Sequence, residues 1–229
     1  MTDLIDFDLA RANMIKQQIR TWVTLDQETQ ALLSVVRRED FVPMAHHAIA
    51  FADLRIPLLH PAEEALQNGH CMLEPKIEAR VLQELRLQHS DKVLEVGAGS
   101  GYMAALLAQV AQRVITLELH PELVAMARAN LQRAGITSVE VRKADGSKGL
   151  AGEGPFDAIV LSGSVAEVPP ALLSQLKVGG RLSAIVGFEP VMRATLITRT
   201  GENTYTTTQP WDTVAPRLAN FPEPSRFHF

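Results

Sequence analysis

The feature that most constrains this chain is a glycine-rich turn between a short apolar strand and an alanine-rich helix. Residues 92–96 predict a buried strand, the next five residues read Gly-Ala-Gly-Ser-Gly, and a helix is predicted over 101–111. Glycine tolerates positive φ and lets a ligand approach bare backbone, and the start of the helix offers unpaired N–H groups. The turn therefore predicts a ligand-binding α/β unit.

Strands and helices alternate on both sides of this turn. A helix is predicted over 77–85 before it, and strand 113–118 and helix 121–134 follow it. Three later strands are predicted at 139–142, 156–161 and 180–186, with a helix at 170–176 and a turn at Gly179-Gly180. Such alternation implies βαβ units. The predicted fold class is therefore α/β, with a doubly wound, mostly parallel, Rossmann-like sheet.

The N-terminal part is predicted to be helical. Ile15, Ile19 and Trp22 form one apolar stripe, which predicts a helix that packs on the core. Asp26 predicts the N-cap of a second helix. That helix is predicted to carry Leu32, Val35 and Val36 and to form a packing pair with the first helix.

The segments on either side of the alternating region differ from it. Residues 43–75 contain four prolines and little periodicity, and we expect a loop that covers a site. Segments 195–198 and 204–208, joined through Gly201, predict an antiparallel pair at the sheet edge. The predicted organisation has three parts: N-terminal helices and a substrate-covering loop over 1–75, a cofactor-binding core over 76–193, and antiparallel strands with a tail over 194–229.

Charge and composition narrow the function classes. The chain has 229 residues, with 22 Lys and Arg against 26 Asp and Glu, a net charge of −4; this balance does not favour nucleic acid or anionic lipid as partners. The lone Cys71 cannot form an internal disulfide. The first six residues do not resemble a signal peptide, and no apolar run reaches the ~18 residues of a membrane span. We expect a cytoplasmic protein without nucleic-acid or membrane partners; the oligomeric state stays open.

Polar residues follow the predicted strands at spacings that suit a cofactor. A dinucleotide turn needs glycine or alanine at the position of Tyr102, whose side chain we expect to obstruct the close approach of the helix. Glu95, followed by glycines at 97, 99 and 101, instead resembles the first motif of class I S-adenosylmethionine-dependent methyltransferases. Glu118 lies 19 residues after Gly99, where a carboxylate can bridge two ribose hydroxyls.

Two more markers follow in the same order. Asp145-Gly146 comes directly after the third strand, where the methyltransferase pattern has an acid that binds the adenine amine. Asp157 lies on the fourth strand and Ser162 at its end. For Asp157 alone, a buried structural acid is the favoured interpretation. For the whole set, the other interpretations are a nicotinamide enzyme or a cofactor-free α/β domain.

The segments before the sheet resemble the protein-L-isoaspartate O-methyltransferase family. Residues 38–43 (Arg-Glu-Asp-Phe-Val-Pro) are similar to its R-x-x-F-V-P segment, and 51–57 to its Y-x-D-x-x-L-P segment. The later pieces that follow the family's order are Asp145-Gly146, 155–159, 176–182 and, in the tail, 214–216. The resemblance covers roughly residues 10–190, and the tail piece 214–216 lies beyond this range.

This resemblance implies methyl transfer from S-adenosylmethionine to the free α-carboxylate of an isoaspartyl residue in a damaged protein, with S-adenosylhomocysteine as product. A carboxylate is ionised at pH 7, so no strong base is needed and catalysis is mostly alignment and desolvation. The implied partner is a peptide or protein that carries a carboxylate. The implied cofactor-binding residues are Glu95, Gly97, Ala98, Gly99, Ser100, Gly101, Tyr102, Glu118, Leu119, Asp145, Gly146 and Ser162.

The chain departs from the family at the substrate loop. The family motif T-I-S-Q-P, whose hydroxyl residues line the substrate site, reads Cys-Met-Leu-Glu-Pro over 71–75. Cys71 thus replaces the threonine and Leu73 the serine, and an insertion in the loop adds Glu63 and Glu64. We therefore expect isoaspartyl methylation to be weak or absent. Two alternatives are a methyltransferase that acts on a different nucleophile and a non-catalytic module that binds S-adenosylmethionine.

Other chemistries have little support. The seven histidines form no H-x-x-x-H or H-x-H pattern and there is one cysteine, so no metal site is predicted. His70-Cys71 is disfavoured as a nucleophilic pair, because adjacent residues of an extended loop point apart. Ser100 and Ser162 are not expected as hydrolase nucleophiles, since no G-x-S-x-G is present. The catalytic residues stay unknown, with Cys71 and Leu73 as the candidate positions.

Overall fold

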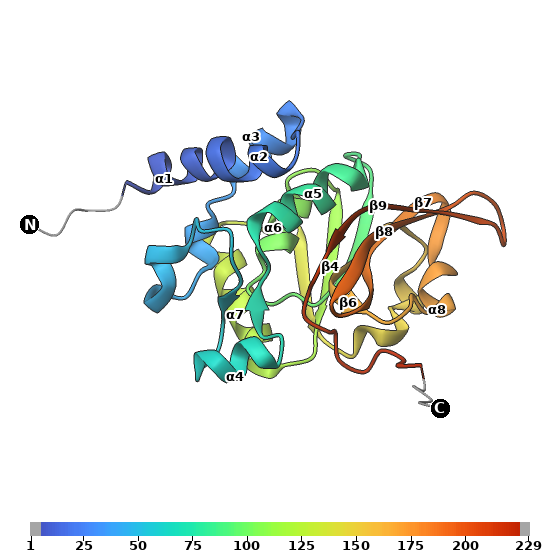
Figure 1. The fold of residues 1–229 in the computed structure, drawn as a ribbon. Coiled ribbons are helices and arrows are strands. Elements are labelled where there is room, and N and C mark those ends of the chain that lie inside the picture. Colours follow the sequence, from blue (N-terminus) through green and yellow to red (C-terminus); the bar gives the residue numbers. More distant parts are fainter. Residues whose placement is uncertain (1–5, 225–229) are drawn as a thin grey trace, which may run out of the picture.

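The computed structural model describes residues 6–224, and Figure 1 shows a central sheet with helices packed against it. Residues 1–5 and 225–229, which include the start of the predicted N-terminal part and His228, lie outside the described residues. Within 6–224, no helix is long and apolar enough to cross a lipid bilayer.

The central sheet confirms the predicted α/β fold class. Its order is β5-β4-β3-β6-β7-β8-β9. The first five strands in this order are parallel, while β8 and β9 form an antiparallel edge. The bounds are Lys92–Val96 (β3), Arg113–Glu118 (β4), Val139–Lys143 (β5), Phe156–Val165 (β6), Leu176–Phe188 (β7), Val191–Arg199 (β8) and Tyr205–Thr213 (β9). Because β4 lies on one side of β3 and β6 on the other, the chain switches direction at β3, which is where open α/β sheets bind ligands.

The two faces of the sheet pack against different partners. The main helices are α5 (Pro75–Leu85), α6 (Tyr102–Ala108), α7 (Pro121–Arg133) and the short α8 (Pro170–Leu173). Val93 and Val114 share a core cluster with residues of α5, α6 and α7. The alternate residue Leu94 points to the opposite face, in a cluster with Leu172 of α8 and Phe221 of the tail. The C-terminal tail is therefore part of the core of this face.

The N-terminal helix is interrupted by a π-helical stretch. Its parts are α1 (Phe7–Asn13), the π-helix η1 (Met14–Ile19) and α2 (Arg20–Trp22). Ile15 and Ile19 are buried as predicted, but Trp22 is 69% exposed, so the predicted stripe is wrong at its end. A π-helix closes i→i+5 hydrogen bonds, which widens the turn and rotates the residues after it. The Trp22 ring instead lies against Lys76, with 4.9 Å between the ammonium nitrogen and the ring centroid.

The second helix, α3 (Gln27–Val35), begins as predicted, because the Asp26 side chain accepts a backbone N–H three residues on at 2.7 Å. Val36 is buried and Leu32 partly buried, but Val35 is 66% exposed. Neighbouring residues at a helix end project in different directions, so Leu32 and Val36 contribute to the packing of this helix and Val35 does not.

The expected loop over 43–75 contains short elements that the sequence did not predict. After the 3₁₀ helix η2 (Arg38–Phe41) come η3 (Met44–Ile49), β1 (Ile56–Pro57), α4 (Ala62–Gln67) and β2 (Cys71–Met72). Strands β1 and β2 pair antiparallel, with Cys71 opposite Pro57. Glu63 and Glu64 lie in the first turn of α4 and are exposed. The β1–β2 pair ends at Met72, three residues before the start of α5.

The C-terminal half differs from prediction at one junction. The helix predicted over 170–176 ends at Leu173, and β7 begins earlier than expected. Gly179-Gly180 lie inside β7, where the register with β6 shifts, so the predicted turn is an irregularity within the strand. The antiparallel pair is confirmed, with Leu196 opposite Thr208. Two further 3₁₀ turns are η4 (Gly146–Lys148) and η5 (Ala151–Glu153).

Candidate functional site

The glycine turn between β3 and α6 is held against the end of β4. The N–H of Gly97 donates to the carbonyl of Leu117 at 2.8 Å, and the N–H of Gly99 to Oε2 of Glu118 at 2.9 Å. Gly97 has a φ of 94°, and a Cβ there would lie 3.0 Å from Leu218 of the tail. Glycine at this position thus suits both the backbone conformation and the close packing of the tail.

The Glu118 carboxylate is oriented by backbone donors. Besides Gly99, which donates to Oε2, the N–H groups of Leu119 and His120 donate to Oε1 at 2.8 and 2.9 Å. Glu118 is 8% exposed, whereas Leu119 is 43% exposed. The carboxylate is therefore held in one orientation at the end of β4, before any ligand contacts it.

Asp145 and Gly146 lie beside the end of β3. Asp145 accepts the N–H of Ser147 and the side-chain amide of Asn220, both at 2.9 Å. The Ser147 N–H is the main cause of a lowered pKa at the Asp145 carboxyl. A Cβ on Gly146 would lie 2.3 Å from a methyl group of Val96, so a larger residue here would collide with β3.

These residues line one cavity of about 240 Å³. It lies between the glycine turn, Glu118, Asp145 and the tail residues Leu218 and Phe221, with His70 on the loop side. Carboxylates at two strand ends and bare backbone at a third suit the ribose, adenine and methionine parts of an adenosyl sulfonium compound. The residues present thus fit the predicted cofactor.

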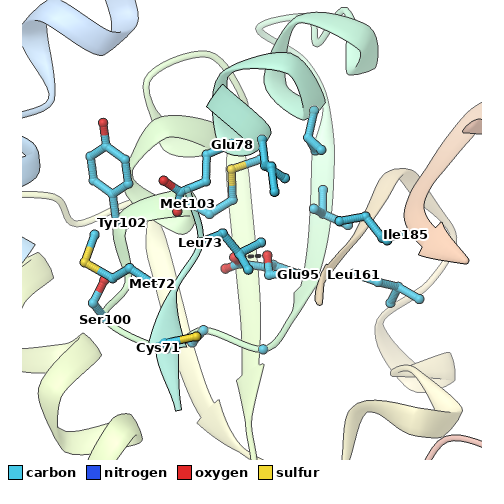
Figure 2. Close-up of a pocket in the computed structure, with 17 residues that line it drawn as sticks. Cys71, Met72, Leu73, Glu78, Glu95, Ser100, Tyr102, Met103, Leu161 and Ile185 are labelled. Atoms are coloured by element: carbon cyan, nitrogen blue, oxygen red, sulfur yellow. Dashed lines mark hydrogen bonds between the residues drawn. The ribbon is translucent and has the colours of Figure 1, made fainter. Parts of the chain in front are cut away.

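A second, smaller cavity of about 40 Å³ adjoins the first. Figure 2 shows Cys71 and Leu73, from the segment before α5, and Glu95, from β3, projecting toward it. Ala98, Ser100 and Tyr102 also line it. Four residues line both cavities: Cys71, Gly97, Gly99 and Ser162. The structure therefore brings the substrate-loop positions next to the predicted cofactor residues.

Glu95 is a fully buried carboxyl at the centre of this arrangement. Its two oxygens accept the hydroxyls of Ser162 and Thr116, each at 2.7 Å. Burial raises the pKa of Glu95 to about 7, against the lowering effect of the two hydroxyls, and the nearby Glu78 and Glu118 raise it further. Near pH 7, both protonation states of Glu95 are therefore populated.

The buried Glu95 carboxyl gives the folded protein a pH dependence. Because its pKa is raised from 4.5 to about 7, its contribution to stability is fully present below pH 4.5 and is lost as the pH rises through 7. We expect the difference in unfolding free energy between wild type and Glu95→Gln to change by about 3 kcal/mol between pH 4.5 and 8. Urea denaturation at several pH values measures it.

The matched control for this prediction is Glu202→Gln, at an exposed position between β8 and β9. It should follow the wild-type pH dependence throughout the range. A Glu95→Gln protein whose stability tracks that of the wild type at every pH would contradict the assignment of a raised pKa.

Arg38 links the substrate loop to the core. Its guanidinium is fully buried and forms an ion pair with Glu78 of α5. It also donates to the carbonyls of Leu73 at 2.8 Å and Ala50 at 3.0 Å. Burial raises the pKa of Glu78 to about 7, although Arg38 lowers it. Arg38 thus fixes the backbone of Leu73 at the wall of the smaller cavity.

The Cys71 thiol is not prepared for nucleophilic attack. Burial raises its pKa to about 11, and the thiolate is the reactive form. The neighbouring His70 ring packs against His120, with centroids 4.7 Å apart. Among residues 6–224, no group of three or more His, Cys, Asp and Glu side chains is placed to hold a metal ion.

Three predicted residues lie away from the cavities or act differently. Gly101 lines neither cavity, and a Cβ there would lie 3.3 Å from Ala127 of α7. Tyr102 is buried with its ring 5.5 Å from that of Phe41, and it lines the smaller cavity but not the larger one; its obstruction of a dinucleotide stays a prediction. Asp157 lies at the opposite end of β6, where it accepts the N–H of Lys92 at 2.8 Å.

The contribution of the tail was not predicted from the sequence. Arg217, Leu218, Ala219 and Phe221 line the larger cavity, and Asn220 binds Asp145. The tail reaches this place because its backbone pairs with Ser164 at the end of β6. The only signal in the sequence was the family-like piece 214–216 directly before these residues.

Comparison with known families decides between the interpretations. The sequence model of "Protein-L-isoaspartate(D-aspartate) O-methyltransferase (PCMT)" matches residues 10–214. The chain belongs to this family. Membership confirms the predicted resemblance, the enzyme class and the cofactor: this is a methyltransferase family that uses S-adenosylmethionine.

Individual relatives agree with this placement. The chain is 41% identical to the protein-L-isoaspartate O-methyltransferase of Koribacter versatilis over 197 residues, covering 86% of this chain and 85% of that one. It is 38% identical to the enzyme of the same name from Methanoculleus marisnigri over 177 residues, or 77% of each chain.

Solved structures share the fold. A protein-L-isoaspartate O-methyltransferase structure superposes with a TM-score of 0.76 at 22% identity, covering 92% of this chain and 66% of that one. A candidate enzyme of this kind from Plasmodium falciparum, in complex with S-adenosyl-L-homocysteine, gives a TM-score of 0.73 at 19% identity, covering 93% and 99%. The PCMT fold thus extends over nearly the whole chain.

Proposed function

We propose that this PCMT-family chain methylates the α-carboxylate of isoaspartyl residues in proteins, with an acceptor pocket altered by Cys71 and Leu73. The observation that carries this proposal is the shared wall of the two cavities, which brings the substrate-loop positions beside the cofactor residues. The expected cytoplasmic location is part of the same proposal, since repair of cellular proteins and a single unpaired cysteine suit a reducing compartment.

The larger cavity is the proposed cofactor site. Glu118 would bind the ribose hydroxyls, Asp145 the adenine amine, and the turn from Gly97 to Gly99 the methionine end. Leu119, half-exposed beside Glu118, would pack on the base. When bound, S-adenosylmethionine supplies an electrophilic methyl group.

The smaller cavity is the proposed acceptor site. Its walls include Leu73, Ile77, Val81 and Ile185, which exclude water from the oxygen that is methylated. Desolvation and alignment of an already ionised carboxylate are what this reaction needs from the protein. No side chain has to remove a proton, which agrees with the protonated thiol at Cys71.

Methyl transfer from labelled S-adenosylmethionine to a synthetic isoaspartyl peptide tests the proposal. The matched substrate control is the same peptide with a normal aspartyl residue at that position. Label on the isoaspartyl peptide alone supports the proposal. Equal labelling of both peptides, or of neither, contradicts it.

Restoring the family hydroxyls is expected to raise activity. In the Cys71→Thr/Leu73→Ser variant, one regained hydrogen bond to a charged group contributes about 1.5–3 kcal/mol, which corresponds to a gain of about 10- to 150-fold in kcat/KM for the isoaspartyl peptide. Leu54→Ser, at a partly exposed site outside both cavities, is the control and should leave kcat/KM unchanged. Wild-type turnover equal to that of a full-motif relative would show that these hydroxyls matter little.

A methyltransferase that acts on a different nucleophile is the second candidate, and the apolar Leu73 beside Glu95 favours it. A neutral acceptor would not require the lost hydroxyls, and the carboxyl at Glu95 would disfavour an anion. A screen of cell extract for labelled methyl acceptors distinguishes this candidate from a non-catalytic module, which would label nothing.

A further inference from the structure

The two cavities are strongly acidic for a site that receives an anion. Glu78 and Glu95 line the smaller one, and Glu118 and Asp145 the larger one. Among the described residues that line either cavity, Arg217 is the one arginine or lysine. A carboxylate entering this space therefore meets a single permanent positive charge of the protein.

The other cations near the substrate loop form ion pairs, as Arg217 does with Glu223, but unlike Arg217 they line neither cavity. Lys76 forms an ion pair with Asp53 at 2.7 Å, and the Arg55 guanidinium lies 3.9 Å from a Glu74 oxygen. Arg38 is buried and held by Glu78. None of these cations lines either cavity, and Arg38 offsets only Glu78, with which it is paired.

The Arg217 side chain is anchored but not fully used. Nη2 donates to the carbonyl of Gly187 at 2.9 Å, and Nε lies 2.9 Å from an oxygen of Glu223. The guanidinium carbon lies 5.2 Å from the centroid of the Phe188 ring. Nη1 is buried and has no hydrogen-bond partner in the described part of the chain. Three contacts thus hold the Arg217 guanidinium in place, while the N–H donors of Nη1 remain without an acceptor among residues 6–224.

The position of Arg217 suits contact with an acceptor. Its backbone pairs with Ser164, two residues beyond Ser162, which lines both cavities. On the other side, the loop approaches closely, since a Cβ on Gly69 would lie 2.9 Å from Pro216. Arg217 therefore lies where the tail and the loop meet, in the wall of the larger cavity and two residues along β6 from the shared residue Ser162.

We propose that Arg217 binds the substrate carboxylate through the free Nη1 and thereby performs part of the role of the hydroxyls lost at positions 71 and 73. The proposal rests on isoaspartyl carboxylates being the substrates. An arginine donor to a carboxylate is a charge-assisted hydrogen bond, stronger than one from a neutral hydroxyl. Because the Arg217 guanidinium is already held in place, it loses little conformational freedom on binding. An anionic substrate would therefore still be recognised, by the guanidinium in place of the hydroxyls absent at positions 71 and 73.

The test compares binding of two peptides in the presence of S-adenosylhomocysteine, measured by calorimetry. One carries an isoaspartyl residue, and the other carries the corresponding α-carboxamide, which has the same shape but no charge. The proteins are wild type, Arg217→Gln, Arg217→Lys and the control Arg193→Gln, whose exposed side chain pairs with Asp212 on the sheet edge. Affinity for S-adenosylhomocysteine is measured for each protein.

Wild type and Arg193→Gln should bind the carboxylate peptide at least about tenfold more tightly than the carboxamide. Arg217→Gln should lose this preference while its affinity for S-adenosylhomocysteine stays within about threefold. Arg217→Lys should keep part of the preference, because the charge remains but the fork is lost; this variant decides the matter where Arg217→Gln does not fold.

Two binding results would overturn the role of Arg217 alone. One is a preference for the carboxylate peptide that survives in Arg217→Gln. The other is a loss of S-adenosylhomocysteine affinity equal to the loss for the peptide, which would make Arg217 a cofactor residue. A wild type that transfers no methyl group and binds neither peptide would overturn the isoaspartyl function and this proposal together. In the methyl-transfer assay, equal kcat/KM values of wild type and Arg217→Gln for the isoaspartyl peptide would likewise overturn only the role of Arg217.

Discussion

Replacing Arg38 by methionine is expected to lower the free energy of unfolding by about 3–5 kcal/mol, because it leaves Glu78 as a buried carboxyl without a cation. Glu78 is 6% exposed and Arg38 fully buried. Without the arginine, the pKa of Glu78 should rise further above about 7. The loss should therefore be larger at pH 8 than at pH 5, as urea denaturation at the two pH values would show.

Two variants make this prediction specific. Arg37→Met removes the neighbouring arginine, whose side chain is 57% exposed, and should cost less than about 1 kcal/mol. Arg38→Met/Glu78→Met removes both charges and should recover most of the stability, since a buried ion pair replaced by apolar groups is often neutral. If Arg38→Met were no more destabilising than Arg37→Met, the buried pair would not have the importance assigned to it.

The same Arg38 variant should affect the acceptor site. Arg38 donates to the carbonyl of Leu73, so its loss frees the backbone at the wall of the smaller cavity. We expect KM for the acceptor peptide to rise, while affinity for S-adenosylhomocysteine changes little because the larger cavity has no contact with Arg38. A fall in cofactor affinity of the same size would mean that the whole sheet edge is disturbed.

Replacing Glu118 by alanine is expected to reduce affinity for S-adenosylhomocysteine at least tenfold. Two hydrogen bonds from ribose hydroxyls to a carboxylate contribute about 1.5–3 kcal/mol each. The alanine variant also leaves the N–H groups of Gly99, Leu119 and His120 without their present acceptor, which loosens the glycine turn. Titration calorimetry measures the affinity, and circular dichroism confirms that the variant is folded.

The control for this prediction is Glu122→Ala, an exposed acid in the first turn of α7. It removes the same charge close to the cavity without removing an acceptor of the backbone N–H groups. Its cofactor affinity should stay within about threefold of the wild type. A folded Glu118→Ala protein with unchanged affinity would exclude the proposed ribose contact.

The sequence by itself determined the parallel sheet, the ligand-binding turn and the family. Short apolar strands that alternate with helices leave few ways to bury both kinds of element, and the structure confirms β3, β4 and β6 within a few residues of prediction. The acids at Glu118 and Asp145 could be predicted because they directly follow strands, and parallel strands end at one edge of the sheet. Local order along the chain is sufficient for such features.

Only the tertiary structure decided which distant residues complete the site. The tail places Leu218 and Asn220 against the glycine turn and Asp145, and no pattern in the tail predicts contacts across such a sequence separation. The burial of Arg38 and the free donor of Arg217 are of the same kind, since both depend on what surrounds a charge in space. Exposure of Trp22 after the π-helical stretch likewise depends on hydrogen bonding that residue types do not specify. Periodicity predicts which side of an element faces the core, whereas the partner of each charged group is set by packing between segments far apart in the chain.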